Sequence, residues 1–391
     1  MERADVLIAG AGTAGLAAAA ALGGLGLRVI VVDPDPEGGD DLRTTAVLRP
    51  GRDLLARAGL WEGVEGEATP LRVMRVVDAG GARPVRRDFE AEELGEAPFG
   101  WNVPNRALRR AFAERLRGLG GVELRRGRFA GRLALAEEVA VALEGGERVA
   151  ARLLVGADGR DSAVRRACGI GARVQRSGQR ALVFTVLHEA PHEGVSTEVH
   201  LRGGPFTLVP LPDREGRPAS SVVWMTEAAE AERLLGLSEG DFARAVNDRA
   251  AGAVGALEPV GGRQAWPIVL QVADRMTARR TALVAEAAHV VPPIGAQGLN
   301  MSLADIEALR GLAERDREGI GSDGWLDAYG RARERDVRVR ALGIGLLNRA
   351  SQGGFGPLRG LGLRLIHDVG PVRRGLMRLG LGQLAPTGRA R

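Results

Sequence analysis

Short apolar runs separated by small residues dominate the first sixty positions of the chain. Asp5–Ala9 and Arg28–Val32 are brief runs typical of buried strands, and the alanine-rich stretch Leu16–Leu25 favours a helix. Val6–Leu27 carries no charge, but its six glycines argue against a membrane span or a signal peptide. The pattern therefore predicts a strand–helix–strand unit.

Further elements follow from the same patterns along the rest of the chain. We expect strands within 71–90, 122–155 and 281–285, a hairpin pairing 207–211 with 220–224, and helices over 52–58, 105–119, 228–250 and 301–314. In this prediction Asn105 caps the second helix. Residues 181–270 are richer in Val, Thr, Trp and Pro, which predicts a sheet-rich insertion forming a second domain. The fold class is therefore α/β with two domains.

A glycine-rich turn joins the first predicted strand to the first helix. Gly10–Gly15 reads GxGxxG: Gly10 permits the tight turn, Gly12 lets the backbone approach a pyrophosphate, and Gly15 lets helix and strand pack closely. The helix start offers free N–H groups to phosphates. Asp33 lies 18 residues beyond Gly15, where an acid accepts ribose hydroxyls. The complete unit predicts binding of FAD or NAD rather than NADP.

Two later segments carry further candidate chemistry. Asp158-Gly159 follows a predicted strand and, taken alone, is an ordinary turn. The stretch from Glu286 to Asn300 holds two prolines and two glycines directly before a helix. A helix start favours negative charge, and a reduced flavin carries negative charge near N1 and O2, so this loop suits flavin better than nicotinamide. His289 in the same stretch is more typical of a structural residue.

Composition removes several classes of function. All 54 basic residues are arginine, which excludes lysine Schiff bases and P-loop lysines. Cys168 is the single cysteine, which excludes internal disulfides and cysteine-rich zinc sites and suits a reducing compartment. Residues 331–391 hold 13 arginines and 3 acids, whereas residues 1–330 hold 41 arginines and 46 acids. The basic character belongs to the tail, and an aromatic content of 4% offers little for base stacking, so nucleic acid is not expected as a partner.

The tail has an amphipathic pattern. Its apolar positions recur every three or four residues, at Leu358, Leu361, Leu365, Val369, Val372, Leu376 and Leu379. Five arginines fall off this stripe, and Pro371 divides it into two predicted helices. Two interpretations remain open: the stripe packs on the protein's own body, or it lies in the interface of an anionic membrane.

With these three motifs the chain resembles the single-component flavoprotein aromatic hydroxylases that share the para-hydroxybenzoate hydroxylase fold. The resemblance implies a Rossmann-like FAD-binding domain of three-layer ββα architecture, an inserted sheet-rich substrate domain and a C-terminal helical tail. We divide the chain accordingly into an FAD-binding domain (1–70, 101–178 and 272–340), a substrate domain (71–100 and 179–271) and the tail (341–391).

The resemblance also implies roles for individual residues. FAD binding would fall to Gly10, Gly12, Thr13, Ala14, Gly15, Asp33, Arg43, Asp158, Glu286, Gly295, Ala296, Gln297, Gly298, Leu299 and Asn300. Asp33 would bind the adenosine ribose, Arg43 the nucleotide portion and Glu286 the ribityl chain. The backbone from Gly295 would cradle the isoalloxazine, with Pro293 facing the reacting edge. One departure stands out: the family's Gly-Asp pair is Ala285-Glu286 here, which keeps the acceptor but restricts the backbone.

Within that family the chain is most similar to the ubiquinone-biosynthesis ring hydroxylases, on the stretches Arg43–Ala46, Pro293–Asn300 and parts of the tail. The implied reaction is hydroxylation of a prenylated phenol by NAD(P)H and O2 through a flavin C4a-hydroperoxide. NAD(P)H would dock transiently, and no base for the phenol is evident. The implied place is the cytoplasm, on the inner membrane face, reached through the tail, with other quinone-biosynthesis proteins as possible partners.

Alternative functions keep the flavin: an isoprenoid reductase, a hydroxylase of a soluble aromatic, or a non-catalytic flavin-binding assembly partner. The para-hydroxybenzoate enzyme itself is disfavoured, because its tyrosine relay has no counterpart in a chain whose single tyrosine is Tyr329.

Overall fold

A mainly parallel sheet of eight strands organises the first part of the molecule. The computed structural model describes residues 1–39, 41–81, 84–95, 98–201 and 203–352. The strand order is β17-β18-β11-β1-β2-β8, and β10 branches from β11 and pairs with β9. The bounds are β1 Glu2–Ala9, β2 Val29–Asp33, β8 Val122–Arg126, β9 Phe129–Ala134, β10 Val139–Leu143, β11 Arg148–Gly156, β17 Thr277–Ala278 and β18 Thr281–Leu283. Strands β18, β11, β1, β2 and β8 are parallel.

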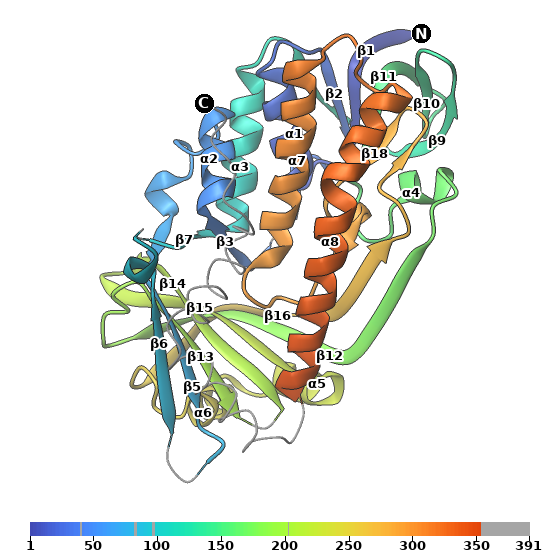
Figure 1. Cartoon of the computed structure of the whole chain (residues 1–391). Coiled ribbons are helices and arrows are strands. Elements are labelled where there is room, and N and C mark those ends of the chain that lie inside the picture. Colours follow the sequence, from blue (N-terminus) through green and yellow to red (C-terminus); the bar gives the residue numbers. More distant parts are fainter. Residues whose placement is uncertain (40, 82–83, 96–97, 202, 353–391) are drawn as a thin grey trace.

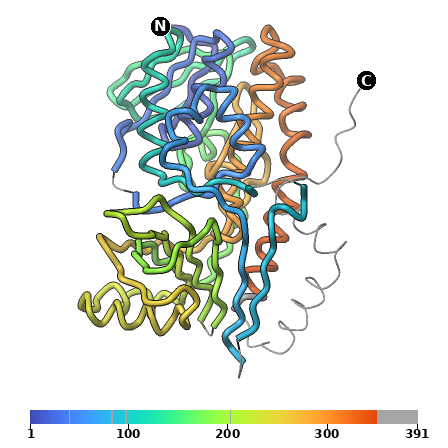
Figure 2. Tube along the Cα trace, turned by 90° about the vertical axis from the view of Figure 1, so that its left-hand side faces the viewer, coloured from blue at the N-terminus to red at the C-terminus, as the bar shows by residue number. Residues whose placement is uncertain are grey.

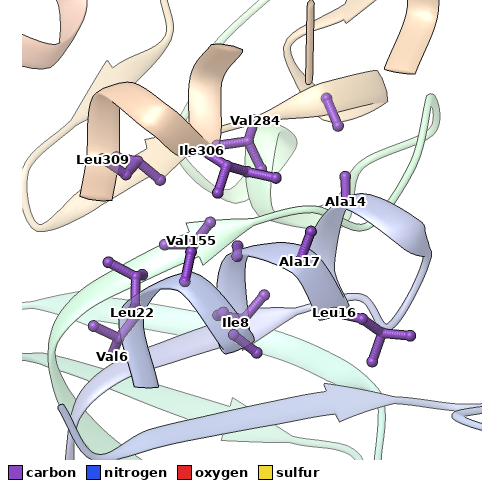
Figure 3. Close-up of a cluster of buried hydrophobic side chains, with 14 of the residues drawn as sticks. Val6, Ile8, Ala14, Leu16, Ala17, Leu22, Val155, Val284, Ile306 and Leu309 are labelled. Carbon is purple, nitrogen blue, oxygen red and sulfur yellow. The ribbon is translucent and has the colours of Figure 1, made fainter. Parts of the chain in front are cut away.

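Helix α1 (Thr13–Gly23) is the centre of the helical layer over this sheet. It packs between α3 (Asn105–Arg117) and α7 (Gln297–Arg315), as Figure 1 shows. Every residue from Ala14 to Leu22 is buried. In Figure 3, Leu22 of α1 lies between Val6 of β1 and Leu309 of α7 in one continuous core. Small alanines along α1 let helix and sheet approach closely, which explains why a stretch without a polar face forms a helix here.

An antiparallel sheet of eight strands forms the second part of the molecule (lower part of Figure 2). Its order is β19-β16-β12-β15-β14-β13-β5-β6, and only β13 and β5 are parallel. The bounds are β5 Val73–Asp78, β6 Val85–Glu90, β12 Ala172–His188, β13 Val195–Leu201, β14 Gly204–Arg214, β15 Arg217–Glu227, β16 Leu257–Ala273 and β19 His289–Val290. The predicted hairpin is confirmed as β14–β15. The domain boundaries themselves stay a prediction.

Two helices cover one face of the second sheet, where the sequence pattern predicted one. α5 (Ala228–Leu235) ends at Gly236, and α6 (Glu239–Ala250) begins after Ser238, whose hydroxyl accepts a hydrogen bond from the amide of Asp241. The prediction of a single helix over 228–250 was wrong because this cap starts a second helix. A separate core that includes Phe184, Phe206 and Trp224 fills the space beneath them.

Short elements join the two sheets. A three-stranded sheet pairs β7 (Gly100–Pro104) with β3 (Thr44–Leu48) and β4 (Thr69–Leu71), and α2 (Arg49–Arg57) follows β3 directly. The remaining short elements are α4 Ala163–Ala167 and three 3₁₀ turns, Glu65–Glu67, Ala91–Leu94 and Ala285–Ala287. The prediction that Asn105 caps α3 was wrong, because its side chain bonds to Thr45 and Asp41 instead.

The long helix α8 (Asp323–Gln352) runs down the outside of the molecule and contacts both sheets (Figure 1). It continues without a break through residue 341, where the predicted tail begins. The predicted apolar stripe from Leu358 onward, with Pro371, lies outside the described residues. Within the described part of the chain, no helix combines the length and apolar character that a membrane crossing requires.

Candidate functional site

The three sequence motifs meet at one edge of the first sheet. Strands β1, β2, β11 and β18 are parallel neighbours, so their carboxyl ends lie side by side. The loops leaving those ends carry Gly10–Gly15, Asp33, Asp158 and Ala285-Glu286. Ligands of open α/β sheets bind in the crevice outside these ends. The structure thus brings together the segments that the sequence separates by more than 270 residues.

The glycine turn has contacts that admit no other residue at two positions. Gly10 has φ +109°, and a Cβ there would lie 2.3 Å from the carbonyl oxygen of Ala157. A Cβ on Gly15 would lie 1.9 Å from the carbonyl oxygen of Gly10. A Cβ on Gly12 would meet nothing within 4 Å, so the backbone there borders open space. No side chain caps α1, and the N–H groups of an uncapped helix start are suited to binding phosphate.

Asp33, at the end of β2, braces the glycine turn. Its carboxylate accepts hydrogen bonds from the amide of Ala11 at 2.6 Å and from the amide of Asp35 at 2.7 Å. A carboxylate has about four lone-pair positions, so it can still accept ribose hydroxyls. This geometry suits the ribose binding that the sequence pattern predicts for Asp33, and which the family resemblance places at the adenosine.

Asp158 caps the neighbouring turn. Its carboxylate accepts from the hydroxyl of Ser162 at 2.5 Å and from the amide of Val164 at 3.0 Å, which fixes the start of α4. The turn also lies directly against Gly10, where an added Cβ would come within 3.0 Å of the Asp158 Cα. Asp158 therefore shapes the wall of the crevice beside the glycine turn.

Arg43 is held on two sides. Its guanidinium donates to both oxygens of Asp41, each at 2.8 Å, and its Cζ lies 4.3 Å from the ring centroid of Trp266. Burial on its own lowers the pKa of Arg43, but the bond to Asp41 outweighs it and the pKa is raised. Asn105 donates to the second oxygen of Asp41. A permanently charged guanidinium is thus held in a fixed orientation, and its charge also interacts with Glu286 of the turn after β18.

Glu286 has kept the acceptor function despite the altered motif. Its carboxylate lies 3.8 Å from Arg160 Nε and also contributes favourable charge at Arg43. Ala285, before it, adopts φ +54°, the left-handed conformation that a glycine adopts freely. The sequence predicted that Ala285 would restrict the backbone. In the structure this restriction is a strained backbone conformation at Ala285, which the surrounding contacts hold in place.

The loop from Pro292 to Asn300 opens α7. Gly295 has φ +62° and Ala296 φ +55°, and α7 starts at Gln297 without a side-chain cap or an acid in its first turn. The Asn300 amide donates to Ala46 O at 2.7 Å and accepts from Leu48 N at 2.9 Å, which ties the loop to β3. Uncapped N–H groups and the positive end of the helix dipole favour an anionic ligand edge at this place.

The outer side of the loop meets the second sheet. Pro293 and Gly298 are exposed, and Leu299 is half-buried. Ile294 packs against an apolar cluster on the sheet made of Ala181, Met225 and Ile268, with Val223 beside them. These side chains project from the face opposite the one that α5 and α6 cover. The surface of the second sheet that Ile294 contacts is therefore apolar.

A buried ionic network lies beneath the turn at Ala285 and the first turns of α7. Asp305 of α7 is fully buried and accepts from His289 Nε2 at 2.7 Å, from Arg333 Nε at 2.8 Å and from the amide of Ala285 at 3.0 Å. Burial favours the neutral carboxyl, but His289 and Arg333 outweigh it and hold the pKa of Asp305 low. His289 is thus an internal partner of Asp305. Tyr329 is fully buried too, and its hydroxyl donates to Leu283 O at 2.9 Å.

Sequence reasoning missed several residues of the site: Asp41, Arg160, Trp266, Asp305 and Arg333. Asp41 precedes Arg43 by two positions, which is a usable local signal. Arg160 follows Asp158 by two positions, which is a local signal of the same kind. Trp266, Asp305 and Arg333 had no such signal. The open backbone at Gly12, the oriented Arg43 and the uncapped start of α7 fit the pyrophosphate, the nucleotide and the flavin ring of FAD.

Comparisons with known proteins agree with this geometry. The model of the family described as "FAD binding domain" matches residues 3–341. The chain is 36% identical to "Ubiquinone hydroxylase UbiL" of Rhodospirillum rubrum, over 97% of this chain and 90% of that protein. It is 27% identical to "3-demethoxyubiquinol 3-hydroxylase" of Escherichia coli, over 97% of this chain and 98% of the relative.

Solved structures share the fold at lower identity. The p-nitrophenol 4-monooxygenase PnpA of Pseudomonas putida superimposes with a TM-score of 0.81 and 20% identity, covering 98% of this chain and 99% of that one. The probable FAD-dependent monooxygenase pqsL of Pseudomonas aeruginosa gives a TM-score of 0.78 and 24% identity, covering 90% of this chain and 97% of that one.

Proposed function

The chain belongs to the FAD binding domain family, and on that premise we propose that it is an FAD-dependent monooxygenase that hydroxylates the ring of a prenylated phenol in ubiquinone biosynthesis. The observation that carries the proposal is a convergence of three segments: the glycine turn, the Asp158 turn and the turn after β18 with Ala285 and Glu286 follow the carboxyl ends of neighbouring parallel strands. Two relatives that match nearly the whole chain, one named a ubiquinone hydroxylase and the other a 3-demethoxyubiquinol 3-hydroxylase, support the substrate class.

In this proposal each loop binds one part of FAD. The amides of Thr13 and Ala14 bind the pyrophosphate, Asp33 the adenosine ribose, and Arg43 the nucleotide portion. The start of α7 from Gly295 to Asn300 holds the isoalloxazine, with Pro293 at its reacting edge. When bound, FAD supplies the electron transfer from NAD(P)H and the activation of O2.

Glu286 completes the cradle at the ribityl chain, and Asp158 holds the wall of the crevice. The protein contributes binding, orientation and exclusion of water, while the oxygen chemistry belongs to the cofactor. The reaction balances as one ring C–H, O2, NAD(P)H and a proton giving the ring hydroxyl, water and NAD(P)⁺.

The apolar cluster on the second sheet would face the substrate. Ala181, Val223, Met225 and Ile268 present no charge beside Ile294, which suits an alkylated ring better than a carboxylated one. This contrast favours a prenylated phenol over a soluble aromatic acid. The remaining alternatives, an isoprenoid reductase and a non-catalytic partner, find no such specific support.

We further propose an anionic membrane surface as a partner. The exposed face of the last turns of α8 carries Val339, Leu342, Leu346 and Leu347, each 52–62% exposed. The same face carries the exposed Arg335, Arg338 and Arg349. Leucine interleaved with arginine is typical of helices that lie in a membrane interface. A substrate with a prenyl chain dissolves in the bilayer, so docking there would bring the enzyme to it.

The test is turnover by the purified chain loaded with FAD. Incubation with NAD(P)H, ¹⁸O2 and a prenylated phenol in detergent should yield a ring-hydroxylated product that carries one ¹⁸O atom. A product without label would indicate a reductase. A preparation that binds FAD but forms no product with any prenylated phenol overturns the proposed substrate class, and one that does not bind FAD overturns the whole proposal.

A further inference from the structure

A continuous chain of hydrogen bonds runs through helix α8 and links the turn at Ala285 to the loop at Gly295. From Asp305 it passes to Arg333, whose Nη1 donates to Asp336 Oδ2 at 2.8 Å. Arg340 Nε donates to Asp336 Oδ1 at 2.8 Å, and Arg340 Nη1 donates to Gln297 Oε1 at 2.9 Å. Gln297 Nε2 then donates to the carbonyl of Gly295 at 2.9 Å. We name this chain the α8 relay.

The α8 relay begins and ends on proposed cofactor-binding backbone. At one end the carboxylate of Asp305 accepts from the amide of Ala285, beside Glu286. At the other end Gln297 holds the carbonyl of Gly295, directly before α7. The middle members are poorly exposed: the side chain of Arg333 is 7% exposed, Arg340 16% and Asp336 24%. A relay of this kind, with its charges alternating and paired, fixes both loops against one rigid helix.

Arg340 is the member with an additional electrostatic role. Its guanidinium lies against Gln297, the first residue of α7, where the helix dipole already favours negative charge. Asp336, bonded to the same guanidinium, partly offsets that positive charge. A reduced flavin gains negative charge near N1 and O2, so the balance of Arg340 against Asp336 acts on the reduced form more than on the oxidised form.

We propose that Arg340 is a positioning residue that holds the flavin loop through Gln297 and, with Asp336, sets the reduction potential of the bound flavin. This inference rests on the proposed FAD site and is independent of which phenol is the substrate.

The experiment measures the dissociation constant of FAD and the midpoint potential of the bound flavin, without substrate, in four variants. Arg340→Gln removes both the positive charge and the paired N–H donors of the guanidinium. FAD should then bind at least about fivefold more weakly, and the midpoint potential should fall. Arg340→Lys keeps the charge and loses the paired donors, so FAD binding should weaken while the midpoint potential stays near that of the wild type. Asp336→Asn leaves Arg340 without its counter-charge, so the potential should rise.

Arg335→Gln is the matched control, because it removes the same charge from the exposed face of α8. Neither quantity should change in it. The opposite signs of the Arg340→Gln and Asp336→Asn shifts separate an electrostatic role from simple loosening, which would move both potentials the same way. Shifts of equal sign, or an Arg340→Gln variant indistinguishable from Arg335→Gln, overturn the inference.

Arg340 and Gln297 border a cavity of about 160 Å³ between α2 and α7, so water can reach Gln297 when the side chain at 340 is shortened. Melting of each variant without FAD checks that it folds, and if Arg340→Gln does not, Arg340→Lys and Asp336→Asn still carry the test. If the variants show these shifts but the wild-type enzyme forms no hydroxylated phenol, only the proposed function is overturned.

Discussion

The guanidinium of Arg43 stacks on the indole of Trp266, with 4.3 Å between Cζ and the ring centroid. Arg43 precedes β3 beside the proposed FAD site, whereas Trp266 lies in β16 of the second sheet. One cation–π contact therefore joins the two parts of the molecule beside the proposed cofactor. Asp41 holds the other side of the same guanidinium, so its plane is fixed from two directions.

Replacing Trp266 tests this stacking. Trp266→Leu removes the ring, and a partly buried cation–π contact contributes about 1 kcal/mol, so FAD should bind about fivefold more weakly. Trp266→Phe keeps a ring face and should lose about half of that free energy. Fluorescence titration of the FAD-free protein measures both. Equal affinity of the leucine variant and the wild type would contradict the bridging role.

Relief of backbone strain at Ala285 is a second prediction. Ala285→Gly removes the Cβ at φ +54° and should raise the free energy of unfolding by about 1 kcal/mol. Ala287→Gly, two residues on, is the control: Ala287 is fully buried and does not have a positive φ, so this change should lower stability by about 1 kcal/mol. Urea unfolding of both variants without FAD decides, and shifts of the same sign would refute the strain argument.

Asp305 makes stability depend on pH. Its pKa is lowered in the folded protein, so the stability it contributes is fully present above the unfolded value of about 3.9 and is lost as pH falls through the folded pKa. Asp305→Asn removes this contribution and leaves buried Arg333 short of a counter-charge, which should cost about 3–5 kcal/mol at pH 7.

Unfolding measured from pH 7 down to pH 3 tests that dependence. The asparagine variant should show a flatter profile between pH 4 and 3 than the wild type, in addition to its lower stability. Asp323→Asn, at the exposed start of α8, serves as the control and should follow the wild-type profile. Parallel profiles for Asp305→Asn and the wild type would show that another group carries the acid sensitivity.

The exposed leucines of α8 predict binding to vesicles. Leu342→Glu and Leu346→Glu, combined in the full chain, should weaken sedimentation with vesicles containing anionic phospholipid at least about tenfold, because apolar contact is lost and charge is repelled. Leu133→Glu, at a position 63% exposed in β9, is the matched control. If the α8 variant instead changes the oligomeric state and leaves vesicle binding intact, the face contacts a second copy of the chain.

Local patterns predicted the parts of the fold whose signals lie close together in sequence. The GxGxxG unit and the hairpin β14–β15 each have their strands, turn and glycines within about 30 residues. The helix break at Gly236–Ser238 also has a local signal, a glycine and a capping serine, which the apolar periodicity over 228–250 masked.

Long-range partners account for what the sequence could not predict. Trp266 lies 223 positions after Arg43, and nothing in either neighbourhood indicates the other. Arg333, Asp336 and Arg340 look like the solvent face of an amphipathic helix, because charge spacing alone cannot tell a solvated pair from an ionic network under a loop. Asn105 had the local signature of a cap, but Asp41 and Thr45 compete for its amide.

The 30 residues of α8 form a rod about 45 Å long that touches strands of both sheets. A helix that packs against the protein at several points along its length resists bending, so α8 holds the two sheets in a fixed arrangement. Thermal unfolding of one sheet would remove the α8 contacts that stabilise the other sheet. We therefore expect the two sheets to unfold together in a single cooperative transition.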